Sequence, residues 1–182
     1  MANSVNTPYA TLSFPHVFEK RARAEGGEPV YSCALLFSPA SQKSPAYKAM
    51  QEACIAAAQE KFGKDVKLKD VAMPFRDAGD KADKLAGYNH GDMYINPWSN
   101  NKVGVVDAHR NEVLLPEELW AGQLVRANVT AFAWMNSGKK GVSFGLNHIQ
   151  IIRTDTPRID GRASASSVFD DGEVTPEAAD LF

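Results

Sequence analysis

Residues 123–135 carry a pattern of side chains suited to holding nucleic-acid bases and phosphates. Every second residue from Val125 to Met135 is apolar and mostly small, as the interior of a small barrel requires. The opposite face of the same strand carries Arg126, Asn128, Thr130, Phe132 and Trp134. Aromatic rings stack on bases at about 1–3 kcal/mol each, and basic side chains bind phosphates. This face therefore predicts a nucleic-acid-binding platform.

The same alternation recurs in residues 92–98, where Tyr94, Asn96 and Trp98 share one face. Basic residues suited to phosphates lie in the turn after residue 136 and in a polar stretch near residue 20. The full set of candidate contacts is Tyr94, Trp98, Arg126, Phe132, Trp134, Lys139, Lys140, Lys20, Arg21 and Arg23. The pattern alone leaves one alternative open, in which Phe132 and Trp134 cover a second small core beneath a helix.

Catalytic and metal-binding chemistry has weaker support in the sequence. Asp77, Asp80 and Asp83 form a D-x-x-D-x-x-D run that would suit Mg²⁺ in a nuclease, but its spacing is not that of a calcium loop. The four histidines are scattered, Cys33 has no evident histidine partner, and no phosphate-binding glycine loop is present. We therefore expect no enzyme activity, no metal and no cofactor, and we interpret the aspartate run as a solvated loop.

Most of the elements that carry these residues have strand character. Residues 9–14 and 29–37 predict two strands, and the polar stretch between them predicts a hairpin loop that forms a basic finger. Further strands are expected at residues 92–98 and 102–108. Residues 123–135 and 141–153, joined by a turn, predict a long β-hairpin. The edge of this hairpin leaves pairing with a second copy, and thus a homodimer, open.

One helix is predicted between the second and third strands. Ser44 suits its N-cap, Pro45 its first position, and Gly63 ends it after residue 62. A 3–4 spacing predicts the buried face, which contains Ala49, Met50, Ala53, Cys54 and Ala57.

Composition bounds the class of protein. The chain has 182 residues, 44% of them hydrophobic and 23% charged, which predicts one ordinary globular domain. No apolar run approaches the roughly 18 residues that a membrane-spanning helix needs, so we expect no membrane contact. Both cysteines lie in apolar segments, which indicates reduced, buried thiols in a cytoplasm.

The charge is unevenly distributed along the chain. All 20 Lys and Arg residues precede residue 163, whereas five of the 22 acidic residues follow it, so residues 1–162 carry a formal charge of +3. We expect an OB-type domain over residues 1–156 and a disordered acidic tail over residues 157–182. The tail residues that we expect to contact a protein partner are Asp170, Asp171, Glu173, Glu177, Asp180 and Phe182.

The chain resembles the small single-stranded DNA-binding proteins encoded by tailed bacteriophages. The resemblance lies in the order of short motifs, none of which is specific alone. These motifs are Leu12-Ser13-Phe14, Pro29-Val30-Tyr31-Ser32, Met73-Pro74-Phe75-Arg76-Asp77, the hairpin 122–153 with Gly145-Leu146-Asn147-His148-Ile149-Gln150, and Phe169-Asp170-Asp171.

The resemblance implies a mainly β fold, a five-stranded OB-fold Greek-key barrel with one inserted α-helix and an acidic C-terminal tail. It implies that the protein binds single-stranded DNA in phage replication, recombination or repair, in the cytoplasm of the infected bacterial host. It also implies that the tail recruits phage or host replication proteins and competes with DNA. A metal-dependent nuclease using Asp77, Asp80 and Asp83, and a phage structural or adaptor protein, remain the alternatives.

Overall fold

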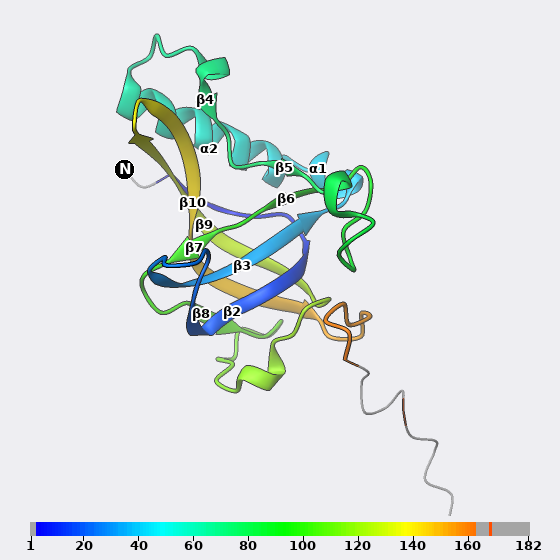
Figure 1. Cartoon of the computed structure of the whole chain (residues 1–182). Helices are drawn as coiled ribbons and strands as arrows, with labels where there is room; N and C mark the ends of the chain where they lie inside the picture. Colours follow the sequence, from blue (N-terminus) through cyan, green and yellow to red (C-terminus); the bar gives the residue numbers. More distant parts are fainter. Residues whose placement is uncertain (1–2, 163–167, 169–182) are drawn as a thin grey trace, which may run out of the picture.

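The computed structural model describes residues 3–162 and residue 168. The described helices are α1 (Pro39–Gln42) and α2 (Pro45–Phe62), with single 3-10 turns at Leu68–Asp70, Gly79–Lys81 and Pro116–Glu118. The strands are β1 (Asn3–Asn6), β2 (Ala10–Ala22), β3 (Pro29–Phe37), β4 (Val71–Ala72), β5 (Arg76–Asp77), β6 (Met93–Ile95), β7 (Trp98–Ser99), β8 (Gly104–Val106), β9 (Leu124–Asn136) and β10 (Lys139–Arg153). The predicted mainly β class and the inserted helix are confirmed (Figure 1).

Five of the strands close into a ring. β2 pairs with β3, β3 with β7, β7 with β10, β10 with β9, and β9 again with β2. Three of these pairs, β3 with β7, β7 with β10 and β9 with β2, are far apart in the sequence, as Greek-key connections produce. β1 extends the sheet beyond β9, and β6 and β5 extend it beyond β3. The predicted five-stranded OB-fold barrel is therefore confirmed.

The interior of the barrel comes from the alternation of β9 and β10. In β9, Val125, Ala127, Val129 and Ala131 are buried, as the sequence predicts. Met135 continues this series but is 60% exposed, because the hairpin of β9 and β10 projects beyond the barrel (Figure 1). The buried residues of β10 are Val142, Phe144, Leu146, Ile149 and Ile151. A register shift between Leu146 and His148 keeps the last two turned inward.

Helix α2 has the ends that the sequence predicts. The Ser44 hydroxyl accepts a hydrogen bond from the Tyr47 N–H at 3.2 Å, and the helix ends at Gly63, whose φ is +94°. Its buried face contains Tyr47, Met50, Ala53, Cys54, Ala57 and Ala58, whereas Ala49 is only half-buried. The helix packs on β9 and β1. No helix of the described residues is long and apolar enough to cross a membrane.

A series of aromatic rings joins the helix to the barrel. The centroids of the Phe37 and Tyr47 rings are 5.4 Å apart, those of Tyr47 and Phe75 are 5.3 Å apart, and those of Phe75 and Phe144 are 5.8 Å apart. Rings at these separations add about 0.5–1.5 kcal/mol per pair beyond burial. The series links β3, α2, the segment before β5, and β10.

Two predicted elements differ from the structure. β2 does not end near Phe14 but continues to Ala22, because its outer half pairs with the start of β3 beyond register shifts near His16. The expected basic finger is therefore mostly strand, and only residues 23–28 form the loop. The expected strand over 92–98 is divided into β6 and β7 at Pro97, which has no N–H to donate to a ladder.

The chain continues to pack on the barrel after β10, through residues 154–160, which we call the C-terminal strap. The Thr156 hydroxyl donates to the Gly122 carbonyl at 2.6 Å, and the Ile159 N–H donates to the Ala121 carbonyl at 3.1 Å. The Arg158 guanidinium lies 5.0 Å from the centre of the Trp120 ring. Gly122, with φ +110°, has no room for a Cβ, which would overlap the Pro157 carbonyl. The strap therefore crosses the expected boundary between residues 156 and 157.

We predict that the strap stabilises the barrel. A chain that ends after Arg162 should unfold at the same temperature as the full chain. For a chain that ends after Arg153, the free energy of unfolding should fall by about 1–3 kcal/mol, because this chain lacks two hydrogen bonds and the contacts of Ile159 and Arg158. For a domain of this size that loss lowers the melting temperature by roughly 2–4 °C per kcal/mol. Differential scanning calorimetry of the three chains measures the difference, and equal melting temperatures would show that residues 154–162 do not stabilise the barrel.

Candidate nucleic-acid interface

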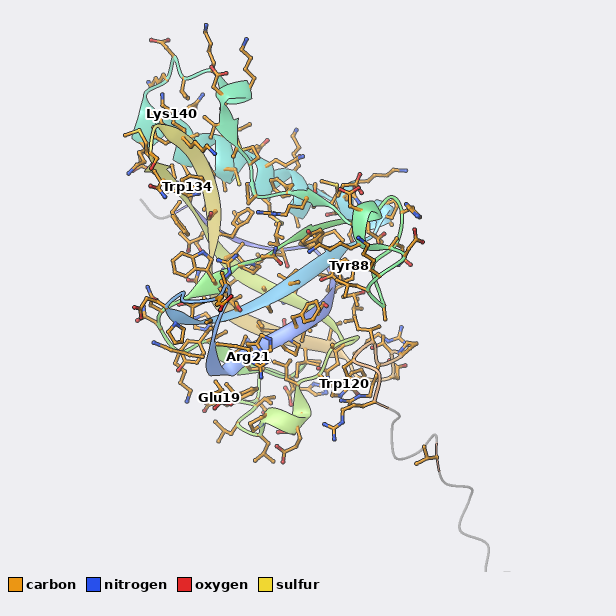
Figure 2. The ribbon with its side chains drawn as sticks, in the orientation of Figure 1. Glu19, Arg21, Tyr88, Trp120, Trp134 and Lys140 are labelled. Carbon is orange, nitrogen blue, oxygen red and sulfur yellow. The ribbon has the colours of Figure 1, made fainter. Side chains whose placement is uncertain are left out.

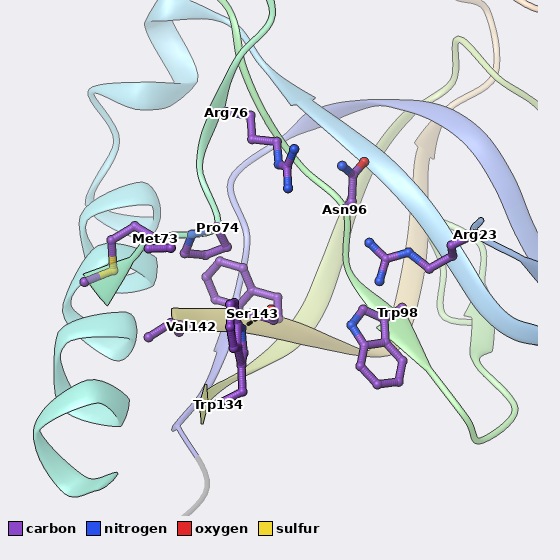
Figure 3. Close-up of a pocket in the computed structure, with 11 residues that line it drawn as sticks. Arg23, Met73, Pro74, Arg76, Asn96, Trp98, Trp134, Val142 and Ser143 are labelled. Atoms are coloured by element: carbon purple, nitrogen blue, oxygen red, sulfur yellow. Dashed lines mark hydrogen bonds between the residues drawn. The ribbon is translucent and has the colours of Figure 1, made fainter. Parts of the chain in front are cut away.

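A hollow of about 110 Å³ lies on the outer face of the barrel, where β5, β7 and β10 approach the segment 72–74. Its described lining residues include two arginines and three aromatic side chains, and none of them is acidic. The lining consists of Arg23, Ala72, Met73, Pro74, Arg76, Asn96, Trp98, Trp134, Val142, Ser143 and Phe144. Figure 3 shows the polar ends of Arg23, Arg76 and Asn96 directed into the same space from three segments.

The two arginines make this hollow positive. The Arg23 guanidinium carbon lies 5.9 Å from the centre of the Trp98 ring. Desolvation by its surroundings, followed by the positive charge of Arg76, lowers the pKa of the Arg23 guanidinium. Neither arginine forms an ion pair with the described carboxylates. Two guanidiniums that repel each other without a carboxylate between them favour the binding of an anion such as phosphate.

Three half-buried aromatic side chains lie at this hollow: Trp98 and Trp134 line it, and Phe132 contacts Trp98. The rings of Trp98 and Phe132 meet edge to face, with centroids 5.8 Å apart, although they come from β7 and β9 on either side of β10. The Trp134 indole N–H donates to the Ser143 hydroxyl at 2.9 Å. All three rings are only half-buried. Each therefore keeps surface on which a planar base can stack.

A second hollow, of about 540 Å³, lies on the other side of Trp134. It is lined by Lys69, Asp70, Val71, Ala72, Trp134, Gly138, Lys139 and Lys140. The Lys140 ammonium lies 5.2 Å from the centre of the Phe62 ring, at the end of α2. Because Trp134 lines both hollows, they form one surface, which we call the groove. Figure 2 shows Trp134 and Lys140 at the end of the molecule where the β9–β10 hairpin meets α2.

Tyr94 does not belong to the groove, so the prediction for this residue is wrong. It is 3% exposed and lies in a second buried cluster with Leu36, Ala78 and Tyr88. The rings of Tyr88 and Tyr94 are 5.5 Å apart, and Lys81 lies over the Tyr94 ring at 4.9 Å. The segment 78–92 thus covers the outer face of β3 and β6. A second small core exists, but Phe132 and Trp134 are not part of it.

Arg126 lies on β9 but far from the aromatic end of the strand. Trp134 lies eight positions further along the strand, which is about 26 Å in an extended chain. Its Nε donates to the Gln150 amide oxygen at 2.7 Å. Between the two, the Asn147 amide donates to the Asn128 and Thr130 side chains at 2.8 and 2.9 Å. The middle of the predicted platform is therefore occupied by internal hydrogen bonds.

The three residues of the predicted basic finger do not lie together: Arg23 lines the groove, whereas Lys20 and Arg21 lie elsewhere. Lys20 lies 5.4 Å from the centre of the Tyr31 ring, and Arg21 pairs with Val30 across β2 and β3. Both line a separate hollow with Pro116 and Leu119. Of the ten predicted contacts, the structure brings together Trp98, Phe132, Trp134, Arg23, Lys139 and Lys140.

The candidate contacts drawn from the sequence omitted Arg76, Lys69 and Asn96, although the alternation in residues 92–98 placed Asn96 on the same face as Trp98. Arg76 lies in a strand of two residues, which is too short to show an alternation. Lys69 lies in a 3-10 turn, and Asn96 lies in the interruption between β6 and β7. The available signal was the motif Met73-Pro74-Phe75-Arg76-Asp77, which contributes Met73, Pro74 and Arg76 to the groove.

The described residues do not support a metal-dependent nuclease. Asp77, Asp80 and Asp83 do not converge, and no group of three potential ligands occurs in residues 3–162. Instead, the Asp77 carboxylate accepts a hydrogen bond from the Gly79 N–H at 2.7 Å within a turn. Burial raises the pKa of the Cys33 thiol to about 12, which removes it as a nucleophile near neutral pH. The predicted tail contacts, from Asp170 to Phe182, lie outside the described residues.

Comparison with known proteins gives a consistent result. The family model described as "Enterobacter phage Enc34, ssDNA-binding protein" matches residues 3–180. The structure of the single-stranded DNA-binding protein from bacteriophage Enc34 in complex with ssDNA has a TM-score of 0.71 at 20% identity, covering 85% of this chain and 89% of that chain. A second structure of the single-stranded DNA-binding protein from bacteriophage Enc34 has a TM-score of 0.69 at 18% identity, covering 92% of this chain and 90% of that chain.

A third solved structure shares the fold. It is gp2.5, a single-stranded DNA-binding protein encoded by bacteriophage T7, with a TM-score of 0.59 at 16% identity, covering 88% of this chain and 97% of that chain. No curated protein sequence matches this chain.

Proposed function

This chain belongs to the family of the single-stranded DNA-binding protein of Enterobacter phage Enc34, and on that premise we propose that it binds single-stranded DNA along the groove, largely independently of base sequence. The observation that carries this proposal is the groove itself. It combines half-buried aromatic rings with cations that have no carboxylate partner among the described residues. The protein would serve phage DNA replication, recombination or repair in the cytoplasm of the infected host.

The mechanism follows from the side chains present. Bases of an unpaired strand stack on Trp98, Phe132 and Trp134, and every base has a π-face that such a ring accepts. The phosphates on one side of Trp134 meet Arg23 and Arg76, and those on the other side meet Lys69, Lys139 and Lys140. Because stacking and charge do not read base edges, binding tolerates any sequence. The protein would act by covering and protecting the single strand, and we propose no catalytic step.

We also propose two protein contacts. The tail residues from Asp170 to Phe182 combine five carboxylates with the aromatic side chain of Phe182, which suits a basic groove on a replication protein. The hairpin edge suggested by the sequence is occupied, because β1 pairs with β9, so a homodimer would instead use β1, which lies at the end of the strand order of the sheet. An edge strand has backbone groups that can pair with a second copy.

We predict that loss of one stacking ring weakens DNA binding. Trp98→Ala and Trp134→Ala should each cost about 1–3 kcal/mol of binding free energy for oligo-dT, because each removes one base–aromatic stack. The third tryptophan, Trp120, is the matched control, since it packs against Arg158 at the opposite end of the molecule (Figure 2). Fluorescence anisotropy titration of the three variants measures the effect. If the Trp120→Ala variant alone loses affinity, the DNA lies at the strap rather than in the groove.

We predict that Arg23 and Arg76 cause part of the salt dependence of the affinity for single-stranded DNA. For a single strand, the slope of log K against log salt is about −0.7 per phosphate contact. Replacing Arg23 and Arg76 together with glutamine should make the slope less steep by up to about 1.4, if each contacts one phosphate. The control is Arg153→Gln, because Arg153 is already paired with Asp155 at 2.6 Å. An unchanged slope in the double variant would place the phosphates elsewhere, with Lys139 and Lys140 the next pair to replace.

We predict that removal of residues 170–182 raises DNA affinity at low salt. These residues lie outside the described part of the chain, so the prediction rests on their charge. A tethered acidic segment reaches effective concentrations of about millimolar and competes with phosphates for the groove. The gain should disappear near 1 M salt, where the Debye length is about 3 Å.

The shortened chain should also lose binding to its replication partner, whereas Phe182→Ala should weaken the partner contact more than it changes DNA affinity. Equal affinities at 50 mM salt, with partner binding retained, would contradict both roles of the tail.

A further inference from the structure

Trp134 occupies space on β10 that only a glycine leaves open. Trp134 and Gly141 are direct cross-strand partners in the β9–β10 hairpin. A Cβ on Gly141 would overlap Cζ2 of the indole and would lie 2.5 Å from Cε2 and 2.8 Å from Cη2. Real Cβ atoms do not approach ring atoms this closely. The ring can therefore keep its place only while residue 141 has no side chain.

The backbone gives no other reason for a glycine at this position. Gly141 is not among the glycines with positive φ, so any residue could adopt its conformation. Glycine in a strand interior lowers stability, because it loses more conformational entropy on folding and offers no side chain to pack. Gly145, on the same strand and the same face, provides a comparison. A Cβ there would meet only backbone oxygen atoms, at 3.7 and 3.9 Å.

Ser143 fixes the ring from the next position on the same face. Its hydroxyl accepts the hydrogen bond from the indole N–H at 2.9 Å. The open space at Gly141 and the hydroxyl at Ser143 together place the ring between the two hollows, both of which it lines.

We infer that Gly141 is a positioning residue for DNA binding: by having no side chain, it holds the Trp134 indole at the boundary between the two hollows, where one base of the bound strand stacks on it. This inference rests on the proposed function. On this inference, the stability that the strand loses by having a glycine at position 141 is offset by tighter DNA binding, and not by any benefit to folding.

The test is a double-mutant cycle on the affinity for a labelled oligo-dT. Gly141→Ala should weaken binding by about 5-fold to 150-fold, the range that corresponds to one lost base stack. In the Trp134→Ala background the same change should have no further effect, because the displaced ring is absent. Gly145→Ala is the matched control: its Cβ would touch no ring, and the pairing of Gly145 with Trp98 is made by backbone atoms alone, so this variant should bind like the wild type.

A second measurement separates positioning from damage to the fold. With Trp98 and Trp120 replaced by phenylalanine, Trp134 is the sole tryptophan. Gly141→Ala should then shift its emission maximum and its quenching by acrylamide in the absence of DNA, while the cooperative unfolding transition is retained. If Gly141→Ala does not fold, Ser143→Ala removes the indole hydrogen bond without adding atoms, and it should weaken binding by a smaller factor than Trp134→Ala.

Three results would overturn the inference. Gly141→Ala could bind like the wild type although the emission of Trp134 shifts, in which case the ring position is not used. It could weaken binding equally in the Trp134→Ala background, in which case it does not act through the ring. Ser143→Ala could bind like the wild type where Gly141→Ala fails to fold. A wild-type protein that does not bind oligo-dT would overturn the proposed function as well, so the two failures are distinguishable.

Discussion

The closure of the barrel at Trp98 is the constraint on which the groove depends. The backbone of this residue pairs with Ser32 of β3 on one side and with Gly145 of β10 on the other. Because two ladders set its backbone, the direction of its side chain is fixed on the outer face, against Phe132 and Arg23. Without this two-residue strand, the barrel would open between β3 and β10. The arginine side of the groove would then separate from the side that carries Trp134.

The positive charge of the groove comes from cations that have no nearby carboxylate, and not from the net charge of the chain. The whole chain has a formal charge of −2, yet Arg23 and Arg76 lack a carboxylate partner among the described residues. Arginines at the other end are neutralised instead. Arg153 pairs with Asp155, and Arg158 with Asp160, at 2.6 and 2.7 Å. The exposed pair of Arg153 and Asp155 contributes little stability. Arg23 and Arg76 differ from the other cations without an ion pair because they line one hollow together with Trp98 and Trp134.

Local signals predicted the elements that are set by near neighbours in the chain. The caps at Ser44 and Gly63 delimit α2, and the alternation of β9 identified Phe132 and Trp134, since both patterns are complete within one element. Tyr94 had the same alternation but is buried, because the segment 78–92 packs over it. No pattern within residues 92–98 could predict that a distant segment covers this face. Arg76 escaped notice for the opposite reason. Its strand has two residues, and only the fold places it opposite Arg23.

Two glycines show why composition cannot separate folding from binding. Gly122 adopts φ +110° and also lies against the strap, so both its backbone and its surroundings exclude a side chain. Gly141 adopts an ordinary strand conformation, and only an indole ring from the neighbouring strand excludes a side chain there. The first glycine is required for the strap to pack, whereas the second is required only by the position of the indole ring. A glycine that the backbone does not require, in a strand that would be more stable without it, points to the side chain that occupies its space. Here that side chain is Trp134, which lines both hollows of the groove.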